Sequence, residues 1–252
     1  MIRWAIVLTL ILAALPLYAD DSAGQLDEFE MANRFYEKKD YASAIRMYES
    51  VLEQGKESAV LYFNLGNAYF KSGELGFAVL NYMKARRLDP GDDDIRHNLE
   101  FARRFSQVQM EGVQLNPINS FVLSIVEPYS FNTVAWVWSI VFVLLIVMLI
   151  VRFGMALTGP AVRAGMVVVV TLLVVSSSLA VFKYRHDYLT RWAVIVAEDS
   201  PVLTGPTEQS DVLLEGAPGL VVEIIEQSGP YYNVLFENKR RGWMKMDLVA
   251  EI

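Results

Sequence analysis

Two long stretches of uncharged, apolar residues constrain the fold more than any other feature of this chain. Between residues 134 and 151 the only polar side chain is Ser139, and between 164 and 182 only Thr171 and the serines at 176–178 carry hydroxyl groups. Uncharged apolar runs of about 18 residues or more are typical of helices that cross a bilayer. We therefore predict two transmembrane helices, at 133–153 and 164–182, joined by a short loop at 154–163.

Flanking residues support a simple helical-hairpin anchor. Tyr129, Phe131, Trp136 and Trp138 gather at one end of the first stretch, as aromatic residues do at membrane interfaces. Asn132 is expected to cap the first of these helices. Neither apolar stretch, 134–151 or 164–182, contains an Asp, Glu, Lys or Arg, which speaks against a proton pathway or a transporter.

The N-terminal residues 1–19 resemble a secretory signal peptide. Arg3 precedes the apolar segment 4–15, and Ala19 offers a small residue before two aspartates. This pattern predicts cleavage after Ala19, with an uncleaved anchor as the alternative. In both cases the chain from residue 20 to the first span emerges outside the cytoplasm.

The orientation of the hairpin has conflicting signals. The signal peptide places the loop 154–163 in the cytoplasm and both flanking domains outside it. That loop region holds two cations, whereas three follow the second span, which runs against the usual excess of positive charge on the cytoplasmic side. The cations are Arg152 and Arg163 on one side and Lys183, Arg185 and Arg191 on the other. We expect the orientation set by the signal peptide, because the charge difference is only one.

Residues 25–58 and 59–92 are similar at a fixed spacing of 34 residues. Gly73 stands in the expected turn of the second copy and Pro90 at its end. The pattern resembles the tetratricopeptide repeat, in which each unit is a pair of helices, and it predicts a helical domain over 20–106 with a capping helix at 93–106. The matched pairs are Ala32/Gly66, Phe35/Tyr69, Tyr36/Phe70, Ala44/Ala78, Tyr48/Tyr82 and Val51/Ala85.

By analogy with this repeat family, the first helices of the units would line a protein-binding groove. The cations with which some relatives hold a peptide's terminal carboxylate are missing, because Phe29, Asp94 and Asn98 occupy those places. The alternative is that Asn64 is only the ordinary consensus residue before Leu65 and Gly66. The predicted groove residues are Phe29, Asn33, Phe63, Asn64, Asn67, His97, Asn98 and Phe101.

A small β domain is predicted at 193–252, following a linker at 183–192. Runs of β-branched and aromatic residues at 193–197, 221–225 and 232–236 indicate strands. Together with Gly242-Trp243-Met244, the order of features resembles a bacterial SH3-like barrel. Aromatic side chains could line a groove in such a domain or form its core. The groove candidates are Tyr231, Tyr232 and Trp243.

Several kinds of chemistry are excluded by composition. The chain has no cysteine and only two histidines, and its net charge is −7. Thiolate metal sites, cysteine nucleophiles and histidine-rich metal sites are therefore absent, and the acidic balance argues against nucleic acid as a partner. Phosphate-binding loops, nucleophile elbows and dinucleotide motifs do not occur. We predict no enzyme activity and no cofactor or metal.

The order of the segments resembles the BatE family of bacterial aerotolerance-operon proteins. The resemblance rests on the repeat 59–92, the segment His97–Glu100 with Ala102, Asn132-Thr133 and Gly242-Trp243. The segments are a signal peptide, helical repeats, a linker at 107–132, two membrane helices and a C-terminal SH3-like domain. Together they form a multi-domain membrane protein with α-helical hairpins and a small all-β barrel.

This resemblance implies a non-enzymatic scaffold in a bacterial inner membrane, with both folded domains in the periplasm. It also implies von Willebrand A-domain membrane proteins as partners and, indirectly, a MoxR-type AAA+ ATPase. Two alternatives stay open. One is an envelope receptor whose SH3-like domain binds peptidoglycan or peptide, and the other is an accessory subunit of a membrane enzyme.

Overall fold

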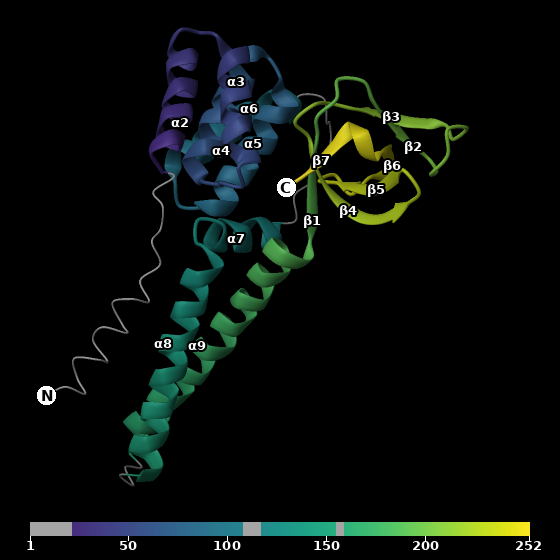
Figure 1. Ribbon diagram of the computed structural model, residues 1–252. Coiled ribbons are helices and arrows are strands. Elements are labelled where there is room, and N and C mark those ends of the chain that lie inside the picture. Colours follow the sequence, from purple (N-terminus) through teal and green to yellow (C-terminus); the bar gives the residue numbers. More distant parts are fainter. Residues whose placement is uncertain (1–21, 108–116, 155–158) are drawn as a thin grey trace, which may run out of the picture. The chain divides into compact units, whose positions relative to one another are not determined.

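The computed structural model describes residues 22–107, 117–154 and 159–252 (Figure 1). The predicted signal peptide at 1–19 lies outside the described residues. The chain divides into two compact units, residues 1–56 and 57–252.

The first unit contains one helical hairpin, made of α2 (Ser22–Glu37) and α3 (Tyr41–Glu53). Asp40 caps α3, because its carboxylate accepts a hydrogen bond from the backbone N–H of Ser43 at 3.1 Å. Ala32, Ala44 and Tyr48 are buried between the two helices. These are three of the positions that the 34-residue repeat identified.

The second unit begins with a matching hairpin, α4 (Ala59–Ser72) and α5 (Leu75–Leu88), followed by α6 (Asp93–Gln107). Gly73 ends α4 in a left-handed conformation with φ of 91°, as the turn prediction requires. Gly66 lies where the helices approach, because a Cβ atom there would stand 2.8 Å from the Tyr82 ring. The Asp92 carboxylate accepts from the N–H groups of Asp94 and Ile95, which starts α6.

α5 lies in the interior of this unit and buries eight of its fourteen residues. Asn81 is the polar member of this set, and its amide donates to the Phe77 carbonyl at 2.8 Å. A helix that is apolar on several sides needs neighbours on several sides. The buried residues are Gly76, Ala78, Val79, Leu80, Asn81, Tyr82, Met83 and Ala85.

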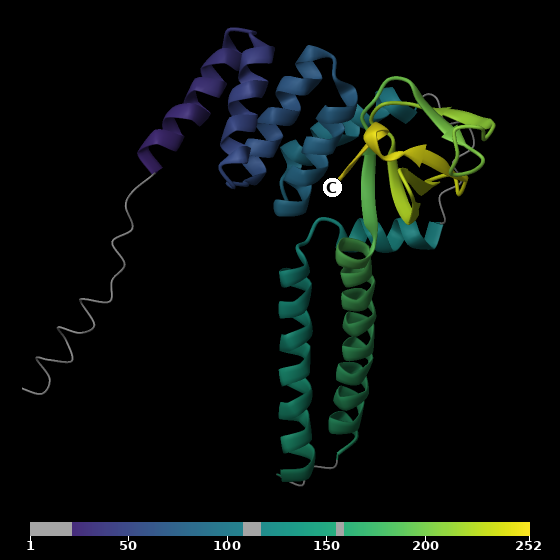
Figure 2. The same ribbon diagram turned by 45° about the vertical axis from the view of Figure 1, so that its right-hand side comes forward.

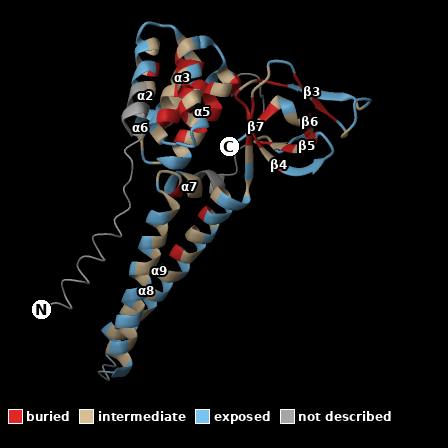
Figure 3. Ribbon diagram, viewed as in Figure 1, coloured by how far each residue is buried: buried red, intermediate tan, exposed pale blue. Residues whose placement is uncertain are grey.

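Two helices of this unit are long and apolar enough to cross a membrane, over Phe131–Gly154 and Pro160–Leu189. They consist of α8 (Phe131–Leu149) with the π-helical turn η1 (Ile150–Gly154), and α9 (Pro160–Tyr184) with the π-helical turn η2 (Arg185–Leu189). Their apolar side chains are exposed along most of their length (Figure 3).

Three details of this hairpin and of the segment before it differ from the sequence-based expectations. Ser130, and not Asn132, caps α8, since its hydroxyl accepts from the Thr133 N–H at 3.2 Å. α9 begins at Pro160, where the ring fits the first turn of a helix, so Arg163 lies inside the helix. The predicted linker 107–132 contains another helix, α7 (Pro117–Val126).

Direct contacts join α8 and α9. The Trp138 indole N–H donates to the Ser177 hydroxyl at 2.8 Å, and Gly165 lies against Met148. Thr171 and Ser178 instead donate to carbonyl groups of their own helix. Among the described contacts, Ser177 is therefore the α9 hydroxyl that hydrogen-bonds to α8.

The C-terminal part forms one antiparallel sheet with the strand order β3-β2-β6-β5-β4-β1-β7. Aliphatic and aromatic side chains on one face, including Ile195, Val222 and Phe236, form its core. The three strands predicted from the sequence correspond to β1, β4 and β5. The elements are β1 (Arg191–Ile195), β2 (Ser200–Leu203), β3 (Val212–Gly216), β4 (Val221–Ser228), β5 (Tyr231–Phe236), β6 (Arg241–Lys245), the 3-10 turn η3 (Met246–Leu248) and β7 (Val249–Glu251).

Candidate functional site

Each helical hairpin contains the same pair of contacts between its two helices, a tyrosine–asparagine hydrogen bond and a packed aromatic pair. In the first unit the Tyr48 hydroxyl donates to the Asn33 side-chain carbonyl at 2.5 Å, and the ring of Phe29 lies 5.8 Å from that of Tyr48. The sequence repeat therefore reproduces side-chain geometry as well as helices, because the residues 34 positions later repeat both contacts.

In the second unit, Tyr82 donates to Asn67 at 2.7 Å, and Phe63 lies 5.9 Å from Tyr82. Asn98 of α6 also donates to the Asn67 carbonyl oxygen, at 2.8 Å. Asn67 thus joins three helices, since it lies on α4 and receives hydrogen bonds from α5 and α6. Four of the predicted groove residues, Asn33, Asn67, Phe29 and Phe63, take part in holding the hairpins together.

A partly exposed aromatic cluster lies on α4 and α6, the helices that carry Asn67 and Asn98. Phe70 packs against Phe101 and Phe105, with ring centroids 5.7 and 5.9 Å apart. Phe101 and Phe105 also contact each other at 5.3 Å, and they remain 52% and 55% exposed. Exposed aromatic side chains held in place by neighbours are characteristic of protein-binding surfaces.

Of the remaining groove residues, His97 is exposed and Asn64 is half-buried. Phe101 is among the predicted groove residues, whereas Phe70 and Phe105, which contact it, were not predicted. The spacing of four residues between Phe101 and Phe105 was the available signal, because residues four apart share one helix face.

The aromatic candidates of the β domain separate into two environments. Tyr231 and Tyr232 are 3% and 5% exposed, so their burial favours the alternative that they belong to the domain's core. The Tyr232 hydroxyl donates to Glu251 at 2.7 Å, and this hydrogen bond is the main cause of a raised Tyr232 pKa and a lowered Glu251 pKa. Trp243 is half-buried on β6 and is the candidate most available to a ligand.

The helical repeat and the β domain share a tight junction that the sequence did not reveal. A Cβ atom on Gly76 of α5 would lie 2.6 Å from the Val196 Cα, just after β1. The Ser106 hydroxyl of α6 is buried and donates to the Pro218 carbonyl at 2.7 Å. Gly219, with φ of 84°, also leaves room for Ser106. The two domains are therefore packed directly on each other within this unit.

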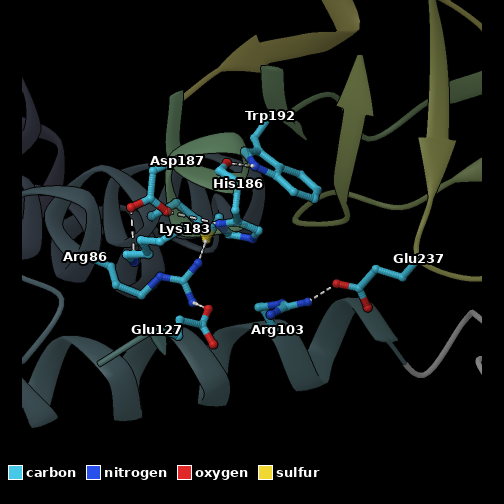
Figure 4. A network of polar contacts seen from close by, with 9 residues as sticks. Arg86, Arg103, Glu127, Lys183, His186, Asp187, Trp192 and Glu237 are labelled. Carbon is cyan, nitrogen blue, oxygen red and sulfur yellow. Dashed lines mark hydrogen bonds and ion pairs between the residues drawn. The ribbon is translucent and has the colours of Figure 1, made fainter. Parts of the chain in front are cut away.

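A network of charged groups lies where this junction meets the apolar hairpin (Figure 4). Arg86 of α5 pairs with Glu127 at 2.5 Å, just after α7. Burial lowers the pKa of the Arg86 guanidinium, and the nearby Glu127 carboxylate partly opposes this shift. Arg103 of α6 pairs with Glu237, which follows β5.

A second group of contacts ties the end of α9 to β1. Lys183 and His186 both approach the Asp187 carboxylate at 3.1 Å. The Trp192 indole N–H donates to the His186 carbonyl, also at 3.1 Å. The first two contacts lie within the end of α9 and η2, and the Trp192 hydrogen bond links this end of the hairpin to β1.

Comparison with known proteins gives one match within the chain. Residues 32–73 match the TPR repeat family, and no match is found among curated proteins. The matched segment runs from α2 through α4 and agrees with the helical pairs of the structure. The helical region is thus a TPR-type repeat, a module that generally mediates protein–protein interaction and is generally non-catalytic.

The described residues offer little for metal chemistry. Among residues 22–107, 117–154 and 159–252, no three histidine, aspartate or glutamate side chains are grouped so that they could hold a metal ion. The three acids at 92–94 illustrate this, because Asp92 is used as a helix cap. What the geometry offers a ligand is a surface of aromatic and amide side chains.

Proposed function

We propose that this chain is a non-enzymatic scaffold, anchored in a membrane by the α8–α9 hairpin, whose TPR-type helices bind partner proteins. The TPR match at 32–73 carries the proposal. The exposed pair Phe101 and Phe105 on α6 is the surface that we assign to the partner. The two apolar helices support the anchor.

The resemblance to the BatE family gives the finer form of this proposal. The membrane is then a bacterial inner membrane, with the helical and β domains in the periplasm and residues 154–163 in the cytoplasm. The partners are von Willebrand A-domain membrane proteins, which would connect the chain indirectly to a MoxR-type ATPase. Asn64, Asn67, His97 and Asn98 would add polar contacts beside the two phenylalanines.

Co-purification from native membranes tests the proposal. Full-length chain carrying Phe101→Ala and Phe105→Ala should lose the proteins that the unmodified chain retains, because truncating central aromatic anchors typically costs about 2 kcal/mol or more of binding energy. Leu88→Ala is the matched control, since Leu88 is an exposed apolar residue (49%) at the end of α5.

The identity of the captured proteins distinguishes the versions of the proposal. Von Willebrand A-domain proteins lost only with the phenylalanine variant would support the finer form. Unchanged capture by that variant would contradict the assigned surface. Binding of the full chain to purified peptidoglycan that depends on Trp243 would instead favour the receptor alternative.

A further inference from the structure

Helix α7 lies across the end of the apolar hairpin. Figures 1 and 2 both show it crosswise to α8 and α9 at the end where the folded domains are attached, and it contacts α9. Only four residues separate its last residue, Val126, from the first residue of α8. The position of α7 is therefore fixed close to the level at which the hairpin helices end.

α7 presents apolar side chains on two sides. Val126 faces the protein and is 3% exposed, while Phe121 and Ile125 face outward and are 67% and 42% exposed. The helix contains no charged residue. The Ser124 hydroxyl donates to the Phe121 carbonyl at 2.7 Å, so this polar group is satisfied within the helix, as an apolar environment requires.

Aromatic residues continue this outward surface onto the hairpin. Tyr129 is 53% exposed just after α7. Phe131 packs against Tyr184 and Tyr188 at centroid distances of 5.8 and 5.6 Å, and both tyrosines are exposed. Tyrosine is enriched where membrane proteins pass from hydrocarbon to headgroups. These residues place the interface at the end of the hairpin where α7 lies.

Most charged side chains at this level pair toward the protein. Lys183 is 5% exposed and is paired with Asp187, and Glu127, the first residue after α7, is paired with Arg86. Phe121, Ile125 and Tyr129 carry no charge, whereas Arg185 at the end of α9 is exposed. Because α7 contacts α9, the outward surface of α7 adjoins the apolar surface of the hairpin. Because the hairpin surface faces lipid in the proposed anchor, lipid is also what covers the adjoining surface of α7.

We propose that α7 is an interfacial helix, lying in the boundary between headgroups and acyl chains with Phe121 and Ile125 immersed in lipid. Helices that lie in this boundary bury an apolar face about 5–10 Å into the headgroup and acyl region. The inference rests on the proposed membrane anchor, since α7 reaches the lipid only if α8 and α9 span it. It adds a third membrane contact beside those of α8 and α9.

Spin labelling of the full chain tests this inference, because the chain contains no native cysteine. Phe121→Cys and Ile125→Cys would each carry a nitroxide, in vesicles of phosphatidylethanolamine and phosphatidylglycerol. Collisions with oxygen report lipid, and collisions with a water-soluble nickel chelate report solvent. Val143→Cys, exposed in the middle of α8, is the lipid control, and Val212→Cys, exposed on β3, is the aqueous control.

We expect the ratio of oxygen to nickel collisions at 121 and 125 to be several-fold higher than at 212 and lower than at 143. Ratios at 121 and 125 equal to that at 212, with 143 in lipid, would overturn the interfacial helix and leave the proposed anchor intact. A water-exposed label at 143 would overturn the anchor and the inference together. Circular dichroism of each labelled protein checks that its total helix content equals that of the unmodified chain.

Discussion

At the scale of single residues, the hydrogen bonds of the TPR-type helices show how the hairpins are held. Tyr48 and Tyr82 occupy equivalent places in the repeat, and each donates to the asparagine fifteen residues before it. A buried hydroxyl needs such a partner, because leaving it unsatisfied costs about 1–3 kcal/mol. Asn33 and Asn67 are therefore structural residues of the hairpins, besides any contact that they make with a partner.

Tyr62 gives a pH-dependent test of the same helices. Burial first, and then its hydrogen bond to Glu57, raises the Tyr62 pKa to about 12. The folded state therefore holds this proton more tightly than the unfolded state, whose tyrosine titrates near 10. The stabilisation is complete below pH 10 and is lost as the pH rises through 12.

We expect Tyr62→Phe to remove this part of the alkaline destabilisation. Urea unfolding followed by circular dichroism between pH 9 and 11.5 should show a shallower loss of stability in the variant than in the unmodified chain. Identical pH profiles would mean that Tyr62 titrates normally in the folded protein. Tyr129→Phe, which alters an exposed tyrosine, is the control.

At the scale of elements, helix boundaries show where local sequence signals compete. Both Ser130 and Asn132 are good capping residues, and the sequence suggested Asn132. The structure uses Ser130, whose backbone is extended with φ of −67° and ψ of 154° and whose hydroxyl reaches the Thr133 N–H. With the cap at Ser130, Asn132 lies inside the first turn of α8 and its side chain is exposed.

Substitution of the two residues distinguishes their roles. Ser130→Ala should destabilise the first turn of α8 by about 1 kcal/mol, so the Thr133 amide should exchange hydrogen roughly fivefold faster at equilibrium. Asn132→Ala should leave that amide nearly unchanged. Hydrogen-exchange mass spectrometry of the peptide that contains residues 130–135, in detergent micelles, measures both. Faster exchange in Asn132→Ala alone would restore the original assignment.

Periodicity and composition predicted the elements well where the signal is internal to an element. The 34-residue spacing predicted both helical pairs, and Gly73 and Pro90 marked the ends of the two helices of the second pair. α7 was not predicted as a helix. Its ten residues with a central apolar patch are too few to show a helical periodicity that would distinguish the segment from a linker. Burial of Tyr231 and Tyr232 depends on how strands from distant parts of the sequence pack together, which an isolated motif does not encode.

At the scale of the second unit, the direct packing of the β domain on α5 and α6 is the feature that the sequence could not supply. The interior glycine of α5 is the residue that permits it. A Cβ atom on Gly76 would meet only backbone at close range, with the Val196 Cα at 2.6 Å and the Ile195 oxygen at 2.7 Å. Backbone of a paired strand cannot move aside as a flexible side chain can.

Gly76→Ala should therefore separate the β domain from the helices although alanine favours a helix interior by roughly 0.5–1 kcal/mol over glycine. Overpacking of this kind costs about 1–3 kcal/mol, and the cost falls on the junction. Exchange should rise in β1 and in the last turn of α6, which bears Ser106, while α4 stays protected. Such a pattern would show that β1 and the end of α6 are stabilised by the packing of the β domain on α5.

The matched control is Gly205→Ala, whose new Cβ would meet only the side chain of Ser210. That side chain can rotate, so exchange at the junction should not change. If Gly76→Ala also left exchange in β1 and α6 unaltered, the two domains would be linked only through the chain and the α9 contacts. Partner binding could then be assigned to each domain separately, and the Phe101 and Phe105 surface would act without the β domain.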